Sequence, residues 1–198
     1  MPVREEDLRD GEVEALGTAG FFCRTQFLGD TQAHALRDQL QAKVKAGSLT
    51  AAHVRRGVDR ALDTALRGDF TTWLMQEDVP ELHAAFRALG EALSGQAYLG
   101  LTRFDLQLAY YPGTGSRYVR HRDAFQGAES RRVTAIWYAN PGWHASHGGA
   151  LRLHTQAGPV DVAPVLDRLV VFMSETLEHE VLPTRAPRLA VTAWFYAR

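Results

Sequence analysis

The sequence has very little cysteine: Cys23 is the single one among 198 residues. One thiol cannot form an internal disulfide, and this usage is typical of proteins that work in a reducing compartment. A lone thiol in such a protein is usually a small, buried, apolar side chain. We therefore expect a fold without disulfides and a cytoplasmic location.

An excess of either charge is also lacking. Lys and Arg number 22 against 23 Asp and Glu, which gives a formal net charge of -1. No broad positive field attracts phosphates or anionic lipids, so neither nucleic acid nor a membrane surface is an expected partner. Apolar runs stay well below the roughly 18 residues of a membrane span, and the acidic N-terminal residues lack the apolar stretch of a secretion signal.

Hydrophobic residues make up 45% of the chain, enough for the core of one compact domain. We predict a single domain over residues 1–198, in which about 1–100 supply helices and a substrate flap and about 101–198 form a β core. Helices are expected from Asp30 and from Pro80, because apolar residues recur at helical spacing after each.

Residues 47–78, between these helices, have few periodic apolar positions and many charges. Long segments of this kind in compact domains are usually functional lids or disordered. We interpret the segment as a surface flap. Its charged residues include Arg55, Arg56, Asp59, Arg60, Asp63, Arg67 and Asp69.

From about residue 101 the pattern changes to short β-rich runs separated by Gly, Pro and Asn turns. The runs are RFDLQLAYY, YVRHRD, RVTAIWYAN, ALRLH, VDVAP, RLVVFM and RLAVTAWFY. Seven or eight strands at this spacing are typical of a jelly-roll sandwich. We predict a mainly β fold with flanking helices and a double-stranded β-helix (jelly-roll) core.

The run YVRHRD carries a candidate pair of metal ligands, His121 and Asp123. Residues two apart on a strand leave the same face, so both can reach one ion. The pair alone is weak evidence, but a third candidate, His179, follows Asp123 by 56 residues. Two imidazoles and one carboxylate on one face of iron(II) leave three coordination positions open, as oxygen chemistry requires.

Arg188 begins the run RLAVTAWFY, in which it shares one face with Thr192 and Trp194. Both faces of this run are substantially apolar, so the guanidinium is expected to point into an enclosed space. A buried guanidinium is costly unless a carboxylate pairs with it. That carboxylate could come from the chain itself or from a bound ligand.

Three further histidines offer a competing metal site: His144, His147 and His154. They flank two glycines and have no carboxylate at a matched spacing. We interpret His144 and His147 as loop residues and His154 as a strand-end residue.

Several segments, in order, resemble the prolyl hydroxylases of the hypoxia-inducible-factor type, a family of iron(II) and 2-oxoglutarate dioxygenases. They are YYPGTGSRYVRHRDAF, RRVTAIWYAN, GGALRLH, LDRLVVFMSE and HEVLPTRAPRLAVTAWFY. LGTAGFFCRTQFLG and LRGDFTTW also resemble that family's leading strand, helix and mobile substrate loop. The resemblance covers about residue 15 to the C-terminus, is weakest from the first helix to the flap, and is most like a bacterial member.

The resemblance implies that His121, Asp123 and His179 bind Fe(II) and that Arg188 pairs with the distal carboxylate of 2-oxoglutarate. It also implies four further roles in the pocket. The Tyr138 hydroxyl would reach the same carboxylate, Tyr111 would lie near the metal end, and the pocket would be lined by Thr192 and Trp194.

The implied reaction is hydroxylation of C4 of a prolyl residue in a protein, such as a translation factor. O2 and 2-oxoglutarate would be consumed, succinate and CO2 released, and ascorbate would support turnover. A contact between Asp69 and Arg131 would tie the flap to the core.

Two alternatives remain: an oxygenase of free amino acids or other small molecules, and a non-catalytic sensor. The flap weighs against the first, and the complete ligand set against the second.

Overall fold

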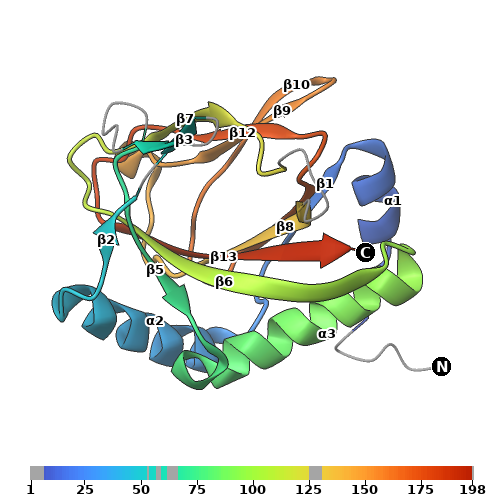
Figure 1. Cartoon of the computed structure of the whole chain (residues 1–198), viewed down its shortest axis with the longest axis horizontal. Helices are drawn as coiled ribbons and strands as arrows, with labels where there is room; N and C mark the ends of the chain where they lie inside the picture. Colours follow the sequence, from blue (N-terminus) through green and yellow to red (C-terminus); the bar gives the residue numbers. More distant parts are fainter. Residues whose placement is uncertain (1–6, 53, 57–58, 62–66, 125–130, 198) are drawn as a thin grey trace.

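The computed structural model describes residues 7–52, 54–56, 59–61, 67–124 and 131–197, with the side chains of 53–66 excepted. Two antiparallel β-sheets face each other, and helices lie on the outer side of the larger sheet (Figure 1). This arrangement confirms the predicted jelly-roll core with flanking helices.

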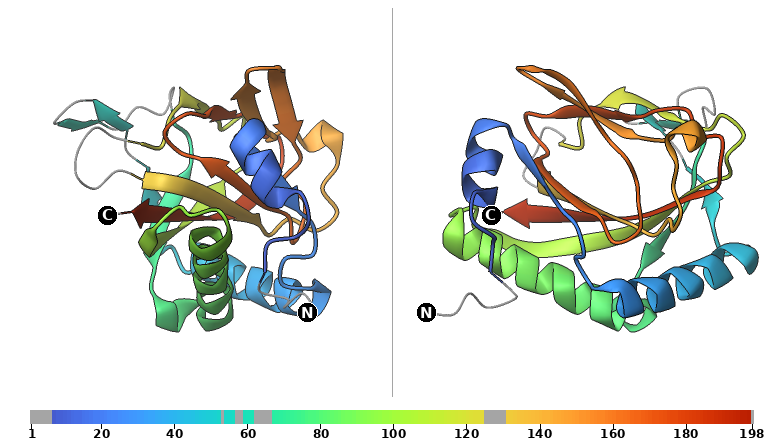
Figure 2. Two further views of the ribbon diagram at one scale, coloured as in Figure 1. Left: turned by 90° about the vertical axis from the view of Figure 1, so that its right-hand side faces the viewer. Right: turned by 180° about the vertical axis from the view of Figure 1, so that it is seen from behind.

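The two predicted helices are confirmed, since α2 begins at Asp30 and α3 at Pro80. Each buries one apolar stripe, which includes Leu36 and Leu40 in α2 and Phe86 in α3. Views from two further sides show α2 and α3 together beneath the large sheet (Figure 2). The helices and 3-10 turns are α1 Glu12–Thr18, α2 Asp30–Lys45, η1 Gln76–Asp78, α3 Pro80–Gln96 and η2 Ala145–His147.

The large sheet has the strand order β1-β11-β8-β13-β6-β5-β2. Three of its strands, β1, β2 and β5, precede residue 100, so the sheet extends beyond the predicted core of about 101–198. Its strands are β1 Phe21–Arg24, β2 Thr50–Ala51, β5 Phe70–Leu74, β6 Leu101–Tyr111, β8 Arg131–Tyr138, β11 Leu169–Met173 and β13 Arg188–Ala197.

The small sheet has the order β10-β9-β12-β7 and lies over the inner face of the large one. Its strands are β7 Tyr118–His121, β9 Leu151–Thr155, β10 Gly158–Val162 and β12 Glu178–Val181. A separate pair, β3 Val54–Arg56 and β4 Asp59–Ala61, forms within the predicted flap. Asp63 of the flap lies outside the described residues.

Strand β13 is covered on both faces, as its composition predicts. Leu189 and Phe195 belong to the core between the large sheet and the helices. Ala190, on the opposite face, belongs to the core between the two sheets. The interior between the sheets is therefore where the side chain of Arg188 lies, and its residue is only 2% exposed.

One buried carboxylate, Asp167, joins the segment before α2 to the large sheet. Its oxygens accept hydrogen bonds from the backbone N–H groups of Leu28 and Gly29, at 2.9 and 2.8 Å. They also accept one from the indole Nε1 of Trp137, at 2.8 Å. These bonds fix the entry of the chain into α2 relative to β8.

Cys23 is exposed on β1, so the expectation of a buried thiol is wrong. The side chain lies on a strand at the border of the large sheet, where a small residue is not enclosed by both layers.

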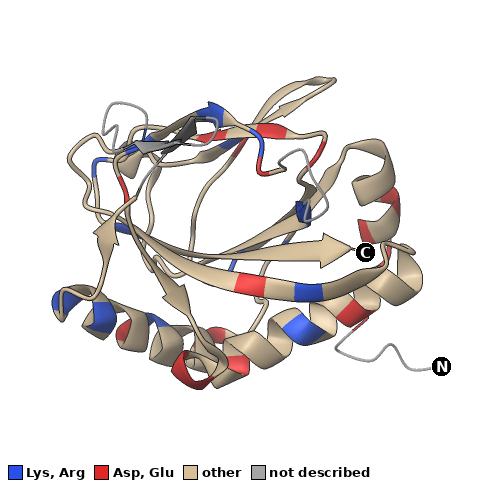
Figure 3. Ribbon diagram, viewed as in Figure 1, with Lys and Arg blue, Asp and Glu red and all other residues tan. Residues whose placement is uncertain are grey.

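Acidic and basic residues are interspersed along α2 and α3 and are not separated by sign (Figure 3). Within the described part of the chain, no helix combines the length and the apolar character needed to cross a membrane.

Candidate metal centre

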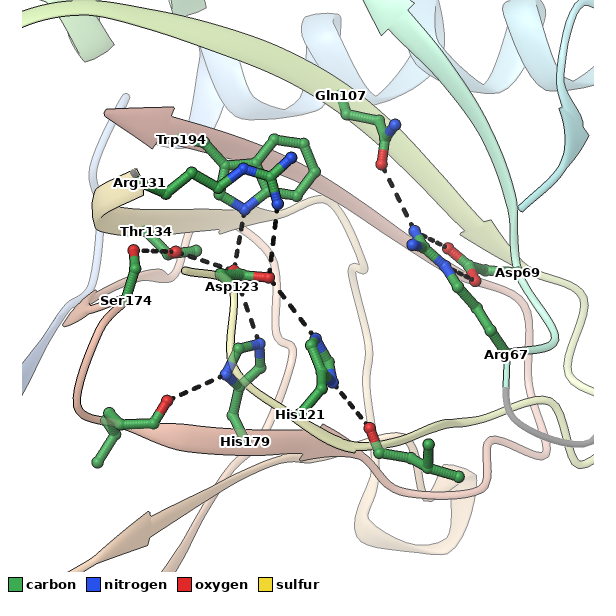
Figure 4. Close-up of polar contacts among 12 residues, drawn as sticks. Arg67, Asp69, Gln107, His121, Asp123, Arg131, Thr134, Ser174, His179 and Trp194 are labelled. Atoms are coloured by element: carbon green, nitrogen blue, oxygen red, sulfur yellow. Dashed lines mark hydrogen bonds and ion pairs between the residues drawn. The ribbon is translucent and has the colours of Figure 1, made fainter. Parts of the chain in front are cut away.

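The three predicted ligands lie together between the two sheets. His179 in β12 stands opposite His121 at the end of β7 in the antiparallel register. One ligand atom from each of these residues and from Asp123 lies within 4.8 Å of the others (Figure 4). The His121 Nε2 to Asp123 Oδ1 distance is 3.6 Å, and His179 Nε2 to Asp123 Oδ2 is 3.7 Å.

Asp123 reaches the other two ligands from a bend and not from a strand. Strand β7 ends at His121, and Asp123 follows two residues later. The prediction that both residues lie on one strand is therefore wrong for Asp123. The chain turns after His121, and this turn brings the carboxylate beside the imidazoles.

Each imidazole presents its Nε2 toward the carboxylate. Nδ1 of His121 lies 2.7 Å from the Val119 carbonyl oxygen, which accepts a hydrogen bond when Nδ1 carries the proton. Burial lowers the pKa of His179 to about 4, although the charge of Asp123 acts in the opposite direction. His179 is therefore neutral near pH 7, the form in which histidine binds metals.

The Asp123 carboxylate is held by two donors on one of its oxygens. Oδ2 accepts hydrogen bonds from Thr134 Oγ1 at 2.8 Å and from Trp194 Nε1 at 2.9 Å (Figure 4). Because the Thr134 proton is used in this bond, Thr134 accepts from Ser174 Oγ at 2.7 Å. This leaves Oδ1 less engaged by the protein, with Arg131 Nη1 at 3.9 Å.

Asp123 stays ionised in spite of its burial. Burial alone raises the pKa of a carboxyl group, but His179, His121 and Arg131 outweigh it and hold the pKa of Asp123 well below its usual range. Two neutral imidazoles and one carboxylate are the donor set of non-haem iron(II) oxygenases. The residues present thus fit iron(II).

The guanidinium of Arg188 lies among aromatic rings. Its Cζ is 4.9 Å from the ring centroid of Tyr111 and 5.0 Å from that of Tyr138, and Nε donates to the Gly149 carbonyl oxygen at 2.9 Å. Among the described residues no carboxylate pairs with Arg188. The alternative of an internal acidic partner thus finds no support in the described part of the chain.

Tyr138 adds a second unsatisfied group next to Arg188. Its hydroxyl is buried and has no hydrogen-bond partner among the described residues. Burial raises the pKa of Tyr138 to about 12, although Arg188 lowers it, so the hydroxyl keeps its proton. A protonated hydroxyl beside an unpaired guanidinium suits the carboxylate of a bound diacid.

The remaining predicted pocket residues lie on β13 itself and on the neighbouring β6. Tyr111 in β6 stands opposite Arg188, and Thr192 in β13 stands between Gln107 and Ile136. Trp194 contacts the metal-ligand candidate Asp123 directly.

The predicted contact between Asp69 and Arg131 is wrong. Asp69 pairs with Arg67, with Nε to Oδ1 at 2.7 Å and Nη2 to Oδ2 at 3.0 Å. Arg131 lies over the Trp194 ring, 3.8 Å from its centroid, and beside Asp123. Arg67 is only two residues from Asp69, so it can satisfy the carboxylate locally.

The competing histidines do not form a metal site within the described residues. His154 Nε2 lies 3.0 Å from Glu180 on the neighbouring strand, and His144 and His147 contact each other in the loop around η2. A cavity of about 310 Å³ near His147 is lined on the sheet by Tyr110 and Leu189. It lies on the helix side of the large sheet and is separate from the metal centre.

Comparison with known proteins decides the family. The profile of the 2OG-Fe(II) oxygenase superfamily matches residues 106–196. Human prolyl hydroxylase EGLN3 is 33% identical over 93% of this chain and 81% of its own length. The chain belongs to the EGLN-type prolyl hydroxylases. This prolyl hydroxylase is accordingly a dioxygenase that uses iron(II) and 2-oxoglutarate.

Two solved structures share the fold of this prolyl hydroxylase. A Pseudomonas putida prolyl-4-hydroxylase is 34% identical with a TM-score of 0.85, covering 95% of this chain and 98% of its own. A Trichoplax adhaerens prolyl hydroxylase, solved with a peptide fragment of the hypoxia inducible factor oxygen degradation domain, is 29% identical with a TM-score of 0.88. That alignment covers 97% of this chain and 90% of the other.

The residues that support the candidate ligands of this prolyl hydroxylase could not be predicted from the sequence. Thr134 and Ser174 look like ordinary members of β runs, and Tyr118 looks like a strand aromatic. Thr134 and Ser174 contact Asp123 or each other from segments that are distant in sequence. Tyr118 contacts His121 within β7, where an irregular register with β12 places both rings together. Neither kind of contact leaves a signal in the spacing of residues.

Proposed function

We propose that this enzyme hydroxylates C4 of a prolyl residue in a protein substrate. His121, Asp123 and His179 would hold the iron, and Arg188 would hold the distal carboxylate of 2-oxoglutarate. The observation that carries these roles is the buried guanidinium. Within the part of the chain that the structure describes, it has no carboxylate beside it, and it adjoins the unpartnered hydroxyl of Tyr138.

The other pocket residues would orient the cosubstrate. Arg188 and Tyr138 would fix its far end, while Tyr111 would lie near the metal end and Thr192 and Trp194 would line the space between. Bound iron supplies the activation of O2, and the protein's part is to position the reactants. One oxygen atom of O2 goes to the substrate and one to succinate, with CO2 released.

The substrate we propose is a proline-containing segment of a cytoplasmic protein, such as a translation factor. Support comes from the Trichoplax adhaerens relative, which was solved in complex with a peptide fragment of the hypoxia inducible factor oxygen degradation domain. The strand pair β3–β4, which extends outward from the body of the molecule in the left view of Figure 2, suits contact with a polypeptide better than enclosure of a small molecule.

The test is incubation with iron(II), ascorbate, 2-oxoglutarate and candidate proteins, followed by mass spectrometry. We expect a gain of one oxygen on proline together with stoichiometric succinate. His179→Ala should abolish both without unfolding the protein, because two ligands hold iron poorly. His154→Ala, a histidine outside the centre, is the matched control and should retain turnover.

Persistent succinate formation by His179→Ala would remove that residue from the metal site. Oxidation of free amino acids, with protein prolines unchanged, would instead support the small-molecule alternative.

A further inference from the structure

We propose that Tyr118 and Arg67 are positioning residues that fix the orientation of the imidazole of His121. This inference rests on the proposed role of His121 as a metal ligand. The proposed effect is that the His121 side chain is already oriented in the metal-free protein. Neither Tyr118 nor Arg67 would contact the metal.

Tyr118 and His121 are stacked face to face. Their ring centroids are 3.7 Å apart and their planes differ by 20°. The Arg67 guanidinium carbon lies 4.5 Å from the centroid of the same tyrosine ring. Because His121 already covers one face of the ring, Arg67 covers the other. The result is a three-layer stack that ends on the candidate ligand.

Arg67 is itself held at several points. Asp69, whose side chain is 0% exposed, accepts two hydrogen bonds from its guanidinium. Gln107 accepts a third, longer one at 3.5 Å. The backbone of Arg67 forms a β-bridge with Tyr118, and the N–H of Gly68 donates to the Arg117 carbonyl oxygen at 2.9 Å. The outer layer of the stack is therefore anchored to β6 and β7.

His121 needs such support more than the other two ligands. Its side chain is 16% exposed, against 9% for Asp123 and 4% for His179. His179 packs against Phe172, with ring centroids 4.6 Å apart, and Asp123 is held by its two donors. For His121 the corresponding contacts are the Val119 carbonyl at Nδ1, the ring of His179 with centroids 4.2 Å apart, and the stacked Tyr118 ring.

A ligand that is already oriented loses less conformational freedom when the metal binds. Partners outside the coordination sphere that orient a ligand typically account for about 10- to 100-fold in metal affinity. Removal of the stack should therefore weaken metal binding even though all three ligand atoms remain.

The experiment measures Mn(II) binding to the apoprotein by calorimetry, without 2-oxoglutarate or substrate, and compares Tyr118→Leu, Tyr118→Phe and Arg67→Gln. Tyr118→Leu should weaken binding by about tenfold, since the aromatic face is lost. Tyr118→Phe keeps the face and should bind like the wild type. Arg67→Gln should weaken binding less than Tyr118→Leu, because Tyr118 remains in place. If Tyr118→Leu does not fold, Arg67→Gln still tests the stack.

Arg103→Gln is the matched control. Arg103 lies over the Tyr196 ring at 3.7 Å and pairs with Asp105, two residues further on, which reproduces the arrangement of Arg67, Tyr118 and Asp69 away from the metal centre. Its substitution should leave Mn(II) affinity unchanged.

Wild-type affinity in folded Tyr118→Leu or, if that variant does not fold, in Arg67→Gln would overturn the proposal. So would an equal loss in Tyr118→Phe, because the hydroxyl would then be the group that matters. If the wild type binds no Mn(II), or if His179→Ala binds it equally well, the proposed metal site itself fails, which is a distinguishable result.

Discussion

At His179, burial and metal binding favour the same protonation state. Its pKa, lowered to about 4 by burial, lies below the ordinary histidine value of about 6.5. In this pH range the unfolded chain binds a proton that the folded chain does not bind. The contribution of His179 to the free energy of unfolding is therefore fully present above about pH 6.5. This contribution is lost as the pH falls toward 4, because the unfolded chain then gains a proton that the folded chain does not bind.

Urea unfolding of the metal-free protein at pH 7.5 and pH 5 tests this effect. We expect His179 to account for a loss of roughly 2 kcal/mol in the free energy of unfolding at pH 5. In His179→Gln, which cannot titrate, the difference between the two pH values should shrink by about that amount. An undiminished difference would show that other groups cause the acid sensitivity.

The proximity of the three candidate metal ligands could be predicted, whereas the contacts that support them could not. The order and spacing of His121, Asp123, His179 and Arg188 resemble a family pattern, and in the structure the first three lie together. The ring stack on His121 depends on an irregular register between β7 and β12, which a sequence pattern does not contain. The supporting residues become visible only once the strands are paired.

Helix α3 contains two glycines, one packed against a core side chain and one with open space around it. A Cβ on Gly90 would lie 2.8 Å from a ring carbon of the buried Phe195, whereas a Cβ on Gly95 would meet nothing within 4 Å. Alanine is intrinsically favoured over glycine in helices by roughly 1 kcal/mol. The two sites therefore separate helix propensity from packing on the same helix.

Gly90→Ala should lower the free energy of unfolding by about 1–2 kcal/mol, because overpacking of the core outweighs the gain in propensity. Gly95→Ala should raise it by roughly 0.5–1 kcal/mol. Denaturant titration of both variants measures the difference. Stabilisation by both would mean that the Phe195 ring moves aside at little cost.

The longer elements follow from the sequence more readily than the short ones. Helices α2 and α3 and strands β6 and β13 carry enough apolar positions to show a period. Strands β1, β2 and β12 have only four, two and four residues, too few for alternation to be seen. Their pairing is decided by neighbouring strands.

For the whole molecule, ligands that bind only the folded state should raise the melting temperature. At a 2-oxoglutarate concentration of about 100 times Kd, the expected stabilisation is about 2.7 kcal/mol. In a domain of this size that corresponds to roughly 5–10 °C. We expect such a shift with Mn(II) and 2-oxoglutarate together, measured by differential scanning fluorimetry.

Arg188→Gln should keep the shift caused by Mn(II) alone and lose the additional shift caused by 2-oxoglutarate. Arg185→Gln, which removes an exposed arginine of the same segment, is its control and should keep both. A full 2-oxoglutarate shift in Arg188→Gln would assign Arg188 a structural role.

The large sheet ends in β1 on one side and in the two-residue β2 on the other. Long, flat borders present rows of unpaired N–H and C=O groups on which another chain can add a strand. Here β1 has only four residues, while β2 pairs with only two residues of β5 and β5 covers only part of β6. The border is therefore a staggered series of short segments and offers such a chain no long, flat strand. The protein can thus carry a wide antiparallel sheet and still have little tendency toward edge-to-edge aggregation at high concentration.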